Sequence, residues 1–183
     1  MIKKQIDKIM DNQKILRGMH RPLKLMPAFM REKLHDLGDC VWMTKDVIFE
    51  ESCRYNLGLK DQFDWNKLFG WCYGITGIHR NSVRVVWRYD DMSDKIEVGL
   101  YMYVDGLRLY PLRTYRLDIG MKYHITLENN CDTIMLKVDG YPAEKRLVAF
   151  PTAKKAYACG LYFGGSRRAP HTMTISMNDD LSF

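Results

Sequence analysis

The sequence contains no continuous apolar run of the roughly 18 residues that a transmembrane helix requires, so we expect no membrane partner. It also lacks a P-loop, an HExxH zinc motif and any Ser-His-Asp or Cys-His grouping that would indicate nucleophilic catalysis. The basic residues 1–8 lead into no apolar segment of the secretory type. These absences predict a protein without a signal peptide, located in the cytoplasm or in a virion.

Cysteine is scarce, and its spacing does not suggest metal or disulfide chemistry. The five cysteines are an odd number, and no two have the C-x-x-C spacing of a zinc site. We therefore expect reduced thiols that fill core and strand positions, and we assign no metal and no cofactor. The cysteines are Cys40, Cys53, Cys72, Cys131 and Cys159.

Charge is concentrated at one end of the chain. The first 35 residues carry nine Lys and Arg against three acids, a difference of six that equals the whole formal net charge of +6. The remaining residues are balanced, so the charge pattern does not indicate a nucleic-acid-binding surface. It predicts a basic N-terminal arm and no nucleic-acid partner.

The spacing of apolar residues predicts that this arm is helical. From Ile2 to Leu16 they recur at threes and fours, which predicts an amphipathic helix over residues 1–19. A second, short helix is predicted over residues 28–37 and ends at Gly38. Such an arm packs either on its own domain or on a partner, and both alternatives stay open. A partner would be another protein subunit, including a second copy of this chain.

After the arm, the apolar period changes to two, which is typical of strands. The clearest alternation covers residues 83–89, where apolar side chains share one face and Arg84 and Arg88 lie on the other. A second alternation follows over residues 96–104 and runs into the hairpin signal Asp105-Gly106. Further strands are predicted over residues 41–50, 64–74, 107–117, 123–127, 134–138, 147–150, 158–163 and 172–177.

About ten strands without βαβ alternation define the fold class. We predict a mostly β protein: an antiparallel two-sheet jelly-roll sandwich with a short helical N-terminal arm. The predicted domains are the arm over residues 1–40 and the sandwich over residues 41–183. Glycines within the strand 64–74 indicate a bulge or a close approach of two backbones, and Pro111 favours a sheet edge or a bulge.

A set of turn and strand residues supports a resemblance to a known superfamily. A strand with His124, a hairpin strand that ends in Asp139-Gly140, and a late Gly164-Gly165 turn follow one another in this order. The order resembles the second half of concanavalin A-like and laminin-G-like domains. Residues 162–171 also resemble uncharacterised sandwich proteins of gut Bacteroidetes and their phages. The resemblance implies a jelly-roll fold and allows several functions.

The carboxylates are poorly arranged for glycoside hydrolysis, which needs two acids on one face of a sheet. Glu97 stands alone on its strand face. Asp90, Asp91 and Asp94 lie in a turn, where acids usually shape the backbone, although they are also candidates for the calcium site common in laminin-G-like domains. We therefore assign no catalytic residue.

Two strands predicted to be neighbours share a face that carries both basic and aromatic residues. Arg84 and Arg88 lie on one strand, and Tyr101 and Tyr103 on the other. Aromatic rings stack on sugar faces, and Arg donates in a fixed fork to hydroxyls or carboxylates. These four residues and His79 are the predicted ligand-binding residues. The alternative is that their side chains lie beneath another layer or beneath the arm.

The favoured interpretation is a non-catalytic binding or assembly module, such as a structural or attachment component of a phage virion. A glycan-binding, lectin-like module is the first alternative. A polysaccharide-cleaving hydrolase or lyase is the second, because lyases of this fold use an imidazole or phenol with an Arg that neutralises a uronate. The chain lacks the Gln-x-His motif by which those lyases resemble each other.

Overall fold

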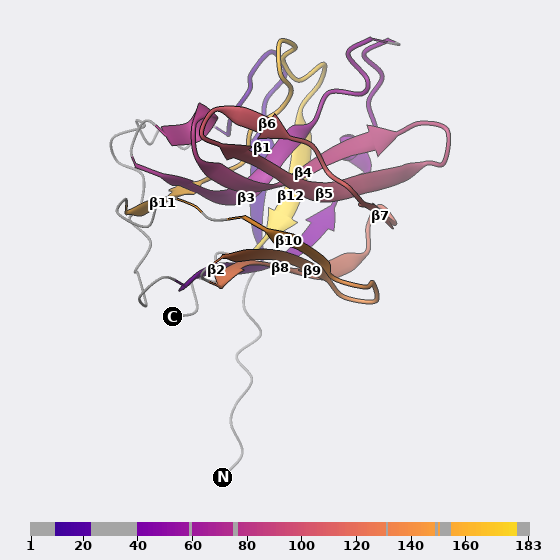
Figure 1. Cartoon of the computed structure of the whole chain (residues 1–183). Helices are drawn as coiled ribbons and strands as arrows, with labels where there is room; N and C mark the ends of the chain where they lie inside the picture. Colours follow the sequence, from indigo (N-terminus) through magenta and orange to yellow (C-terminus); the bar gives the residue numbers. More distant parts are fainter. Residues whose placement is uncertain are drawn as a thin grey trace.

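The strands form two antiparallel sheets stacked on one another (Figure 1). The predicted mostly β, two-sheet antiparallel sandwich is therefore confirmed. The described residues include two short 3-10 turns, η2 (Glu51–Cys53) and η3 (Gly77–His79), but no helix long and apolar enough to cross a membrane. The computed structural model describes residues 10–22, 40–58, 60–74, 77–130, 132–148, 150 and 155–178.

The first sheet has six strands in the order β1-β12-β2-β8-β9-β10. Its longest pairing joins β2 to β8, from Cys40 opposite Asn130 to Ile48 opposite Lys122. The strands are β1 (Asp11–Ile15), β2 (Cys40–Phe49), β8 (Lys122–Asn130), β9 (Thr133–Val138), β10 (Glu144–Leu147) and β12 (Met173–Met177).

The second sheet has the order β11-β3-β4-β5-β6, and β7 also pairs with β5. The predicted hairpin turn joins β5 to β6, with φ of 48° at Asp105 and 87° at Gly106, the left-handed conformation that a tight hairpin needs. The strands are β3 (Asn66–Tyr73), β4 (Ser82–Asp90), β5 (Lys95–Val104), β6 (Leu107–Leu109), β7 (Thr114–Leu117) and β11 (Ala156–Cys159).

The hydrophobic core lies between the two sheets. Along β4, Val83, Val85 and Trp87 are fully buried in it, as their period of two predicts. The ring of Trp87 lies 5.3 Å from that of Phe49 on β2, across the interface of the sheets. Burying each such side chain contributes about 1.5–3 kcal/mol. The alternate side chains of β4 consequently point away from the core, to the outer face of the second sheet.

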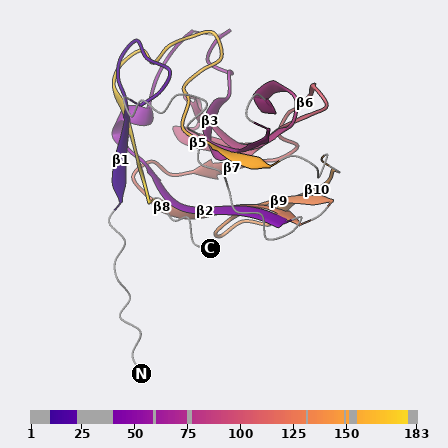
Figure 2. The same ribbon diagram turned by 90° about the vertical axis from the view of Figure 1, so that its left-hand side faces the viewer.

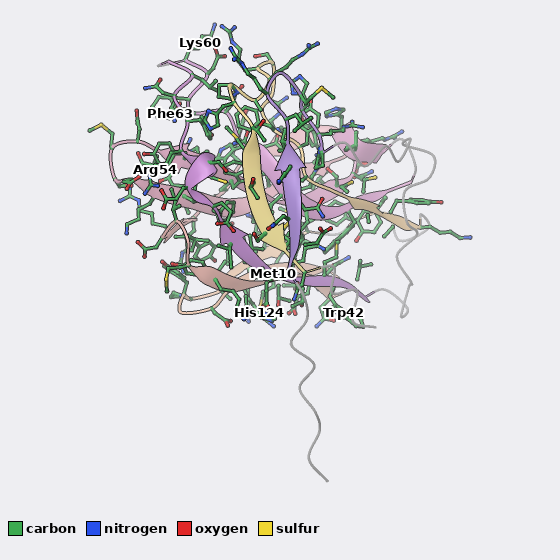
Figure 3. All side chains as sticks on the ribbon, turned by 180° about the vertical axis from the view of Figure 1, so that it is seen from behind. Met10, Trp42, Arg54, Lys60, Phe63 and His124 are labelled. Carbon is green, nitrogen blue, oxygen red and sulfur yellow. The ribbon has the colours of Figure 1, made fainter. Side chains whose placement is uncertain are left out.

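The predicted helix over residues 1–19 is wrong where the structure describes it. Asp11–Ile15 is β1, a strand that pairs with β12 along the sheet edge, with Ile15 opposite Met173 (Figure 3). The edge of β12 offers unpaired backbone groups, and pairing with them overrides a helical apolar period. Residues 1–9 and the second predicted helix, over residues 28–37, lie outside the described residues. The domain boundary at residue 40 stays a prediction.

Three predicted strands are interrupted or displaced along the chain. The predicted strand over residues 107–117 is interrupted around Pro111, which lacks a backbone donor, and becomes β6 and β7. The strand predicted over 147–150 lies earlier, as β10. The strand predicted over 158–163 is β11, which ends at Cys159, after which Tyr162 makes an isolated bridge to Lys67.

Gly70 on β3 shows the close backbone approach that the glycines of this segment predict. Its φ is +148°, and a Cβ on it would lie 2.2 Å from the carbonyl oxygen of Val83 on β4. The register between β3 and β4 also shifts between Lys67 and Phe69, which marks the predicted bulge. The pairing of β3 with β4 therefore requires a residue without a Cβ at position 70.

We expect Gly70→Ala to lower the free energy of unfolding by about 2–3 kcal/mol, because the new methyl group overlaps a backbone carbonyl and strains the chain. Urea denaturation followed by tryptophan fluorescence measures this. Gly160→Ala is the matched control, since a Cβ there would meet nothing within 4 Å, and it should change the free energy by less than about 1 kcal/mol. Equal losses in the two variants would contradict the explanation.

Candidate ligand-binding site

A cavity of about 680 Å³ lies on the outer face of the second sheet. Its floor comes from β4 and β5, whose outward side chains Arg84, Tyr101 and Tyr103 are at most 7% exposed. Arg88 of β4 and His79 of η3 also line it, so all five residues predicted to bind a ligand border one space. The volume falls within the range of about 300–1,000 Å³ usual for small-molecule sites. That the five residues bind a ligand stays a prediction.

Side chains that sequence reasoning missed complete the lining. Trp65 and Lys67 are two residues apart near the start of β3, and Arg108 and Tyr110 are two apart at the end of β6. The repeated pairing of a basic with an aromatic residue two positions away was a signal that could have found them. The missed lining residues are Arg21, Phe63, Asp64, Trp65, Lys67, Ile78, Arg108, Tyr110, Tyr162, Gly164 and Gly165.

Positive charge dominates the cavity. Five of its lining residues are Lys or Arg, whereas Asp64 is the single carboxylate among the described residues that line it. Arg84 is only 4% exposed, and its Nη2 donates to the carbonyl oxygen of Ile78 at 3.2 Å. Arg21 and Arg108 are exposed, but Arg84 and the half-buried Lys67 place two cations near each other away from water, which is unfavourable unless negative charge accompanies them. The arrangement therefore favours an anion in the cavity.

Lys67 shows the effect of this crowding on a titratable group. Its Nζ donates to the carbonyl oxygens of Trp65 at 2.6 Å and Gly164 at 3.4 Å. Burial first, and then the positive charge of Arg84, lowers the pKa of Lys67 to about 8. An anionic ligand beside Nζ would raise this pKa again.

The two tyrosines of the floor continue into a wall that Tyr110 and Arg108 form. The ring of Tyr101 meets Tyr103 at 5.7 Å and Tyr110 at 5.8 Å, edge-on in both cases. Arg108 donates from Nε to the Tyr103 hydroxyl at 2.9 Å and from Nη1 to the Tyr110 hydroxyl at 3.1 Å. Burial raises the pKa of Tyr101, so its hydroxyl stays protonated. This wall offers a ligand hydroxyl groups and aromatic rings.

Arg88 lies at the end of the cavity that is lined by Phe63 and Trp65. The guanidinium carbon of Arg88 is 4.3 Å from the centre of the Trp65 ring and 5.6 Å from that of Phe63. Its Nη2 is 2.6 Å from a carboxylate oxygen of Glu97, which is 6% exposed. Glu97 is thus neutralised by Arg88 and does not line the cavity, so the acid pair that hydrolysis needs is missing there.

His79 lies near Tyr103, with its ring edge-on to that tyrosine at a centroid distance of 5.4 Å. Burial, followed by the positive charges of Arg84 and Arg108, lowers the pKa of His79. Its imidazole is therefore neutral at neutral pH and able to accept a proton.

The segment after β1 contributes another wall. The backbone N–H of Gly18 donates to the carbonyl oxygen of Ala169 at 2.8 Å, and the two segments run side by side beyond the second sheet in both views (Figures 1 and 2). His20 stacks on Tyr162 at 4.9 Å, and the guanidinium of Arg21 lies 5.5 Å from the centre of the same ring. Part of the predicted N-terminal arm therefore belongs to the cavity.

The three aspartates considered for calcium do not converge on one point. Asp94 is hydrogen-bonded to Arg54 at 2.7 Å and to the Tyr89 hydroxyl at 2.9 Å. Asp90 instead accepts a hydrogen bond from Ser93 at 2.6 Å. Within the described part of the chain, no group of three His, Cys, Asp or Glu side chains is placed to hold a metal ion.

No family model and no curated protein matches the sequence, but solved structures share its fold. One of them is alginate lyase AlyC3, which has also been solved in complex with dimannuronate. Its alignment covers 92% of this chain and 72% of the AlyC3 chain, with a TM-score of 0.55. The sequence identity is 10% for the first structure and 11% for the complex. This likeness shows a jelly-roll β-sandwich, the fold that the sequence predicts. Membership of the concanavalin A-like or laminin-G-like superfamily stays a prediction.

Two further matches have lower TM-scores. The family 7 alginate lyase A1-II' in complex with its product covers 96% of this chain and 72% of its own, with a TM-score of 0.49 and 8% identity. The carbohydrate-binding module CBM66 from Bacillus subtilis covers 77% and 73%, with a TM-score of 0.44 and 10% identity. The predicted similarity to proteins of gut Bacteroidetes and their phages stays a prediction.

Proposed function

We propose that the protein binds an acidic glycan in this cavity, with uronic-acid carboxylates beside its basic side chains. The observation that carries the proposal is that, among the residues the structure describes, five Lys or Arg and six aromatic side chains line one space together with a single carboxylate, Asp64. A neutral sugar would not need this charge, and a purely anionic ligand without ring faces would not need the aromatic residues.

The chemistry of the lining residues fits such a ligand. A guanidinium donates two parallel hydrogen bonds to one carboxylate, as Arg108 or Arg84 would, and Lys67 adds a compact positive charge. Aromatic rings offer broad apolar faces to the C–H groups of a sugar ring. Because Arg84 lies on the buried floor of the cavity, its interaction with a carboxylate is stronger than it would be in water.

The fold comparison supports the proposal by analogy alone. AlyC3 has been solved with dimannuronate, an acidic disaccharide, and this chain shares its fold. Shared folds host many functions, so the proposal depends on the residues of the cavity and not on that likeness.

Isothermal titration calorimetry with trisaccharides of mannuronate and of galacturonate tests the proposal. We expect the better ligand to lose about tenfold or more in affinity in Lys67→Met and in Arg108→Gln, because each variant removes a charged hydrogen bond worth about 1.5–3 kcal/mol. Arg167→Gln is the control, since Arg167 is exposed, pairs with Asp61 and does not line the cavity. No heat with any acidic oligosaccharide, or equal losses in all three variants, would overturn the proposal.

The pKa of Lys67, lowered to about 8, predicts that binding depends on pH. Below pH 8 the Nζ is charged and attracts the carboxylate, whereas above pH 8 it becomes neutral and the affinity falls. We expect an affinity loss of about tenfold between pH 6.5 and pH 9.5. Lys67→Arg keeps its charge over this range, so its affinity should stay nearly constant. A wild-type profile as flat as that of Lys67→Arg would contradict the role of Lys67.

A second candidate function is cleavage of the bound glycan by β-elimination, which the neutral His79 beside Tyr103 favours. His79 would take the proton from the carbon next to the carboxylate. The released electron pair would form a C=C bond as the C–O bond to the leaving sugar breaks, and Tyr103 would protonate the leaving oxygen. Arg84 would neutralise the carboxylate during this step.

Ultraviolet absorbance of the unsaturated uronate product tests for this reaction. If the protein is a lyase, His79→Asn should slow product formation by about 100-fold or more while leaving binding largely intact. His124→Asn is the matched control, because His124 lies far from Phe63 of the cavity and pairs with Asp46 (Figure 3). If the protein binds the glycan but the absorbance does not change, cleavage is excluded and glycan binding remains as the proposed function.

An assembly role through the N-terminal arm, such as that of a structural or attachment component of a phage virion, stays a prediction. Much of the arm, residues 1–9 and 23–39, lies outside the described residues. Binding of an acidic surface glycan would be compatible with attachment.

A further inference from the structure

We propose that the cavity binds the end of an acidic glycan chain and not an internal stretch of it. This inference rests on the proposed function and specifies how the ligand enters. A polymer bound along its length needs a groove that is open at two sides, whereas a chain end needs only one opening.

The outer face of the second sheet is not an open groove, because a loop covers one end of it. Val86 points outward from β4, yet it is fully buried, because it packs in a cluster with Tyr101, Tyr103 and Trp65. Arg88 holds the loop before β3 in place, since its Nη1 donates to the carbonyl oxygen of Phe63 at 3.2 Å. The segment with Phe63 and Trp65 therefore closes the cavity at the Arg88 end of β4.

A second obstruction stands on the next strand. Gly99 points outward from β5, and a Cβ on it would lie 2.7 Å from Cβ and Cγ of Pro111. Pro111 therefore rests directly on the sheet surface where a chain crossing the strands would have to pass. The adjoining Tyr110 lines the cavity from the same loop.

The loop that carries Pro111 is hydrogen-bonded to β10 of the first sheet. Glu144 and Arg146 of β10 form an ion pair at 2.8 Å, with side chains that are 5% and 8% exposed. Arg146 Nη2 donates to the carbonyl oxygen of Tyr110 at 2.5 Å, and Glu144 accepts from the backbone N–H of Leu112 at 3.4 Å. The loop that carries Pro111 is thus tied at two points to a buried pair.

The two remaining sides are also bounded by anchored segments. Beyond the Ser82 end of β4 lies η3, where the Ser82 hydroxyl donates to the carbonyl oxygen of Ile78 at 2.8 Å. On the β3 side, Arg21 and Tyr162 line the cavity, and Lys67 exchanges two backbone hydrogen bonds with Tyr162, at 2.8 and 2.9 Å. Described segments thus stand on each side of the cavity floor, an arrangement that fits terminal sugar residues better than a chain passing across the sheet.

The stoichiometry of binding to acidic chains of defined length tests this. We would titrate the protein with oligomannuronates and with oligogalacturonates of 3, 8 and 20 sugars and measure the number of protein molecules bound per chain by calorimetry and by sedimentation velocity. End binding predicts one protein per chain at every length, with affinities per chain that agree within about threefold. A number that rises with chain length would overturn the inference and leave the proposed function standing. No binding at any length would overturn both.

A loop variant provides an independent measurement. Pro111→Gly removes the side chain that rests on Gly99 and leaves the lining residue Tyr110 in place, while Leu112→Gly changes an 80% exposed residue of the same loop and serves as the control. We expect more than one molecule of the Pro111→Gly variant per 20-sugar chain and one molecule of the control. If the Pro111→Gly variant is folded, binds the 3-sugar chain and still binds the 20-sugar chain one to one, Pro111 is not the barrier and the inference fails.

Discussion

The pairing of β4 with β5 is the constraint on which both the core and the cavity depend. Its register places Arg84 opposite Tyr101 and Arg88 opposite Glu97 on the outer face, while Val85 lies inward. Because side chains alternate with a period of two, a slip by one residue would turn the basic and tyrosine side chains into the core. Packing between the sheets therefore determines the geometry of the floor of the cavity.

The same register brings charge together at a cost to the folded protein. The lowered pKa of Lys67 shows that the cavity disfavours a further positive charge, and the lowered pKa of His79 has the same causes. Asp64 and the buried Glu97 offset only part of this charge. Shifted pKa values and uncompensated charge of this kind are typical of functional sites, where stability is given up for function. An acidic ligand would supply the missing negative charge.

The two-sheet fold and the floor of the cavity could be predicted from the sequence because the alternation of side chains along a strand is a local signal. Arg84 and Tyr101 were predicted correctly to share a face, because side chains along a strand alternate with a period of two. The contribution of Arg21 to the cavity was not predictable, because residues 11–15 pair with β12, more than 150 residues away, and no local pattern indicates such a partner. The role of Tyr162 likewise arises from contacts across the chain, with His20 and Lys67. The interruption at Pro111, by contrast, follows from its missing backbone donor, which the sequence indicates.

The most direct test of an acid-binding cavity compares one oligosaccharide with its carboxyl-reduced counterpart, which has the same rings and linkages but no charge. Calorimetric titration of both at pH 6.5 isolates the contribution of the carboxylates. The charge of the cavity predicts that the acidic trisaccharide binds at least about 100-fold more tightly, as expected when two charged hydrogen bonds are lost. Equal affinities for the two ligands would contradict the account.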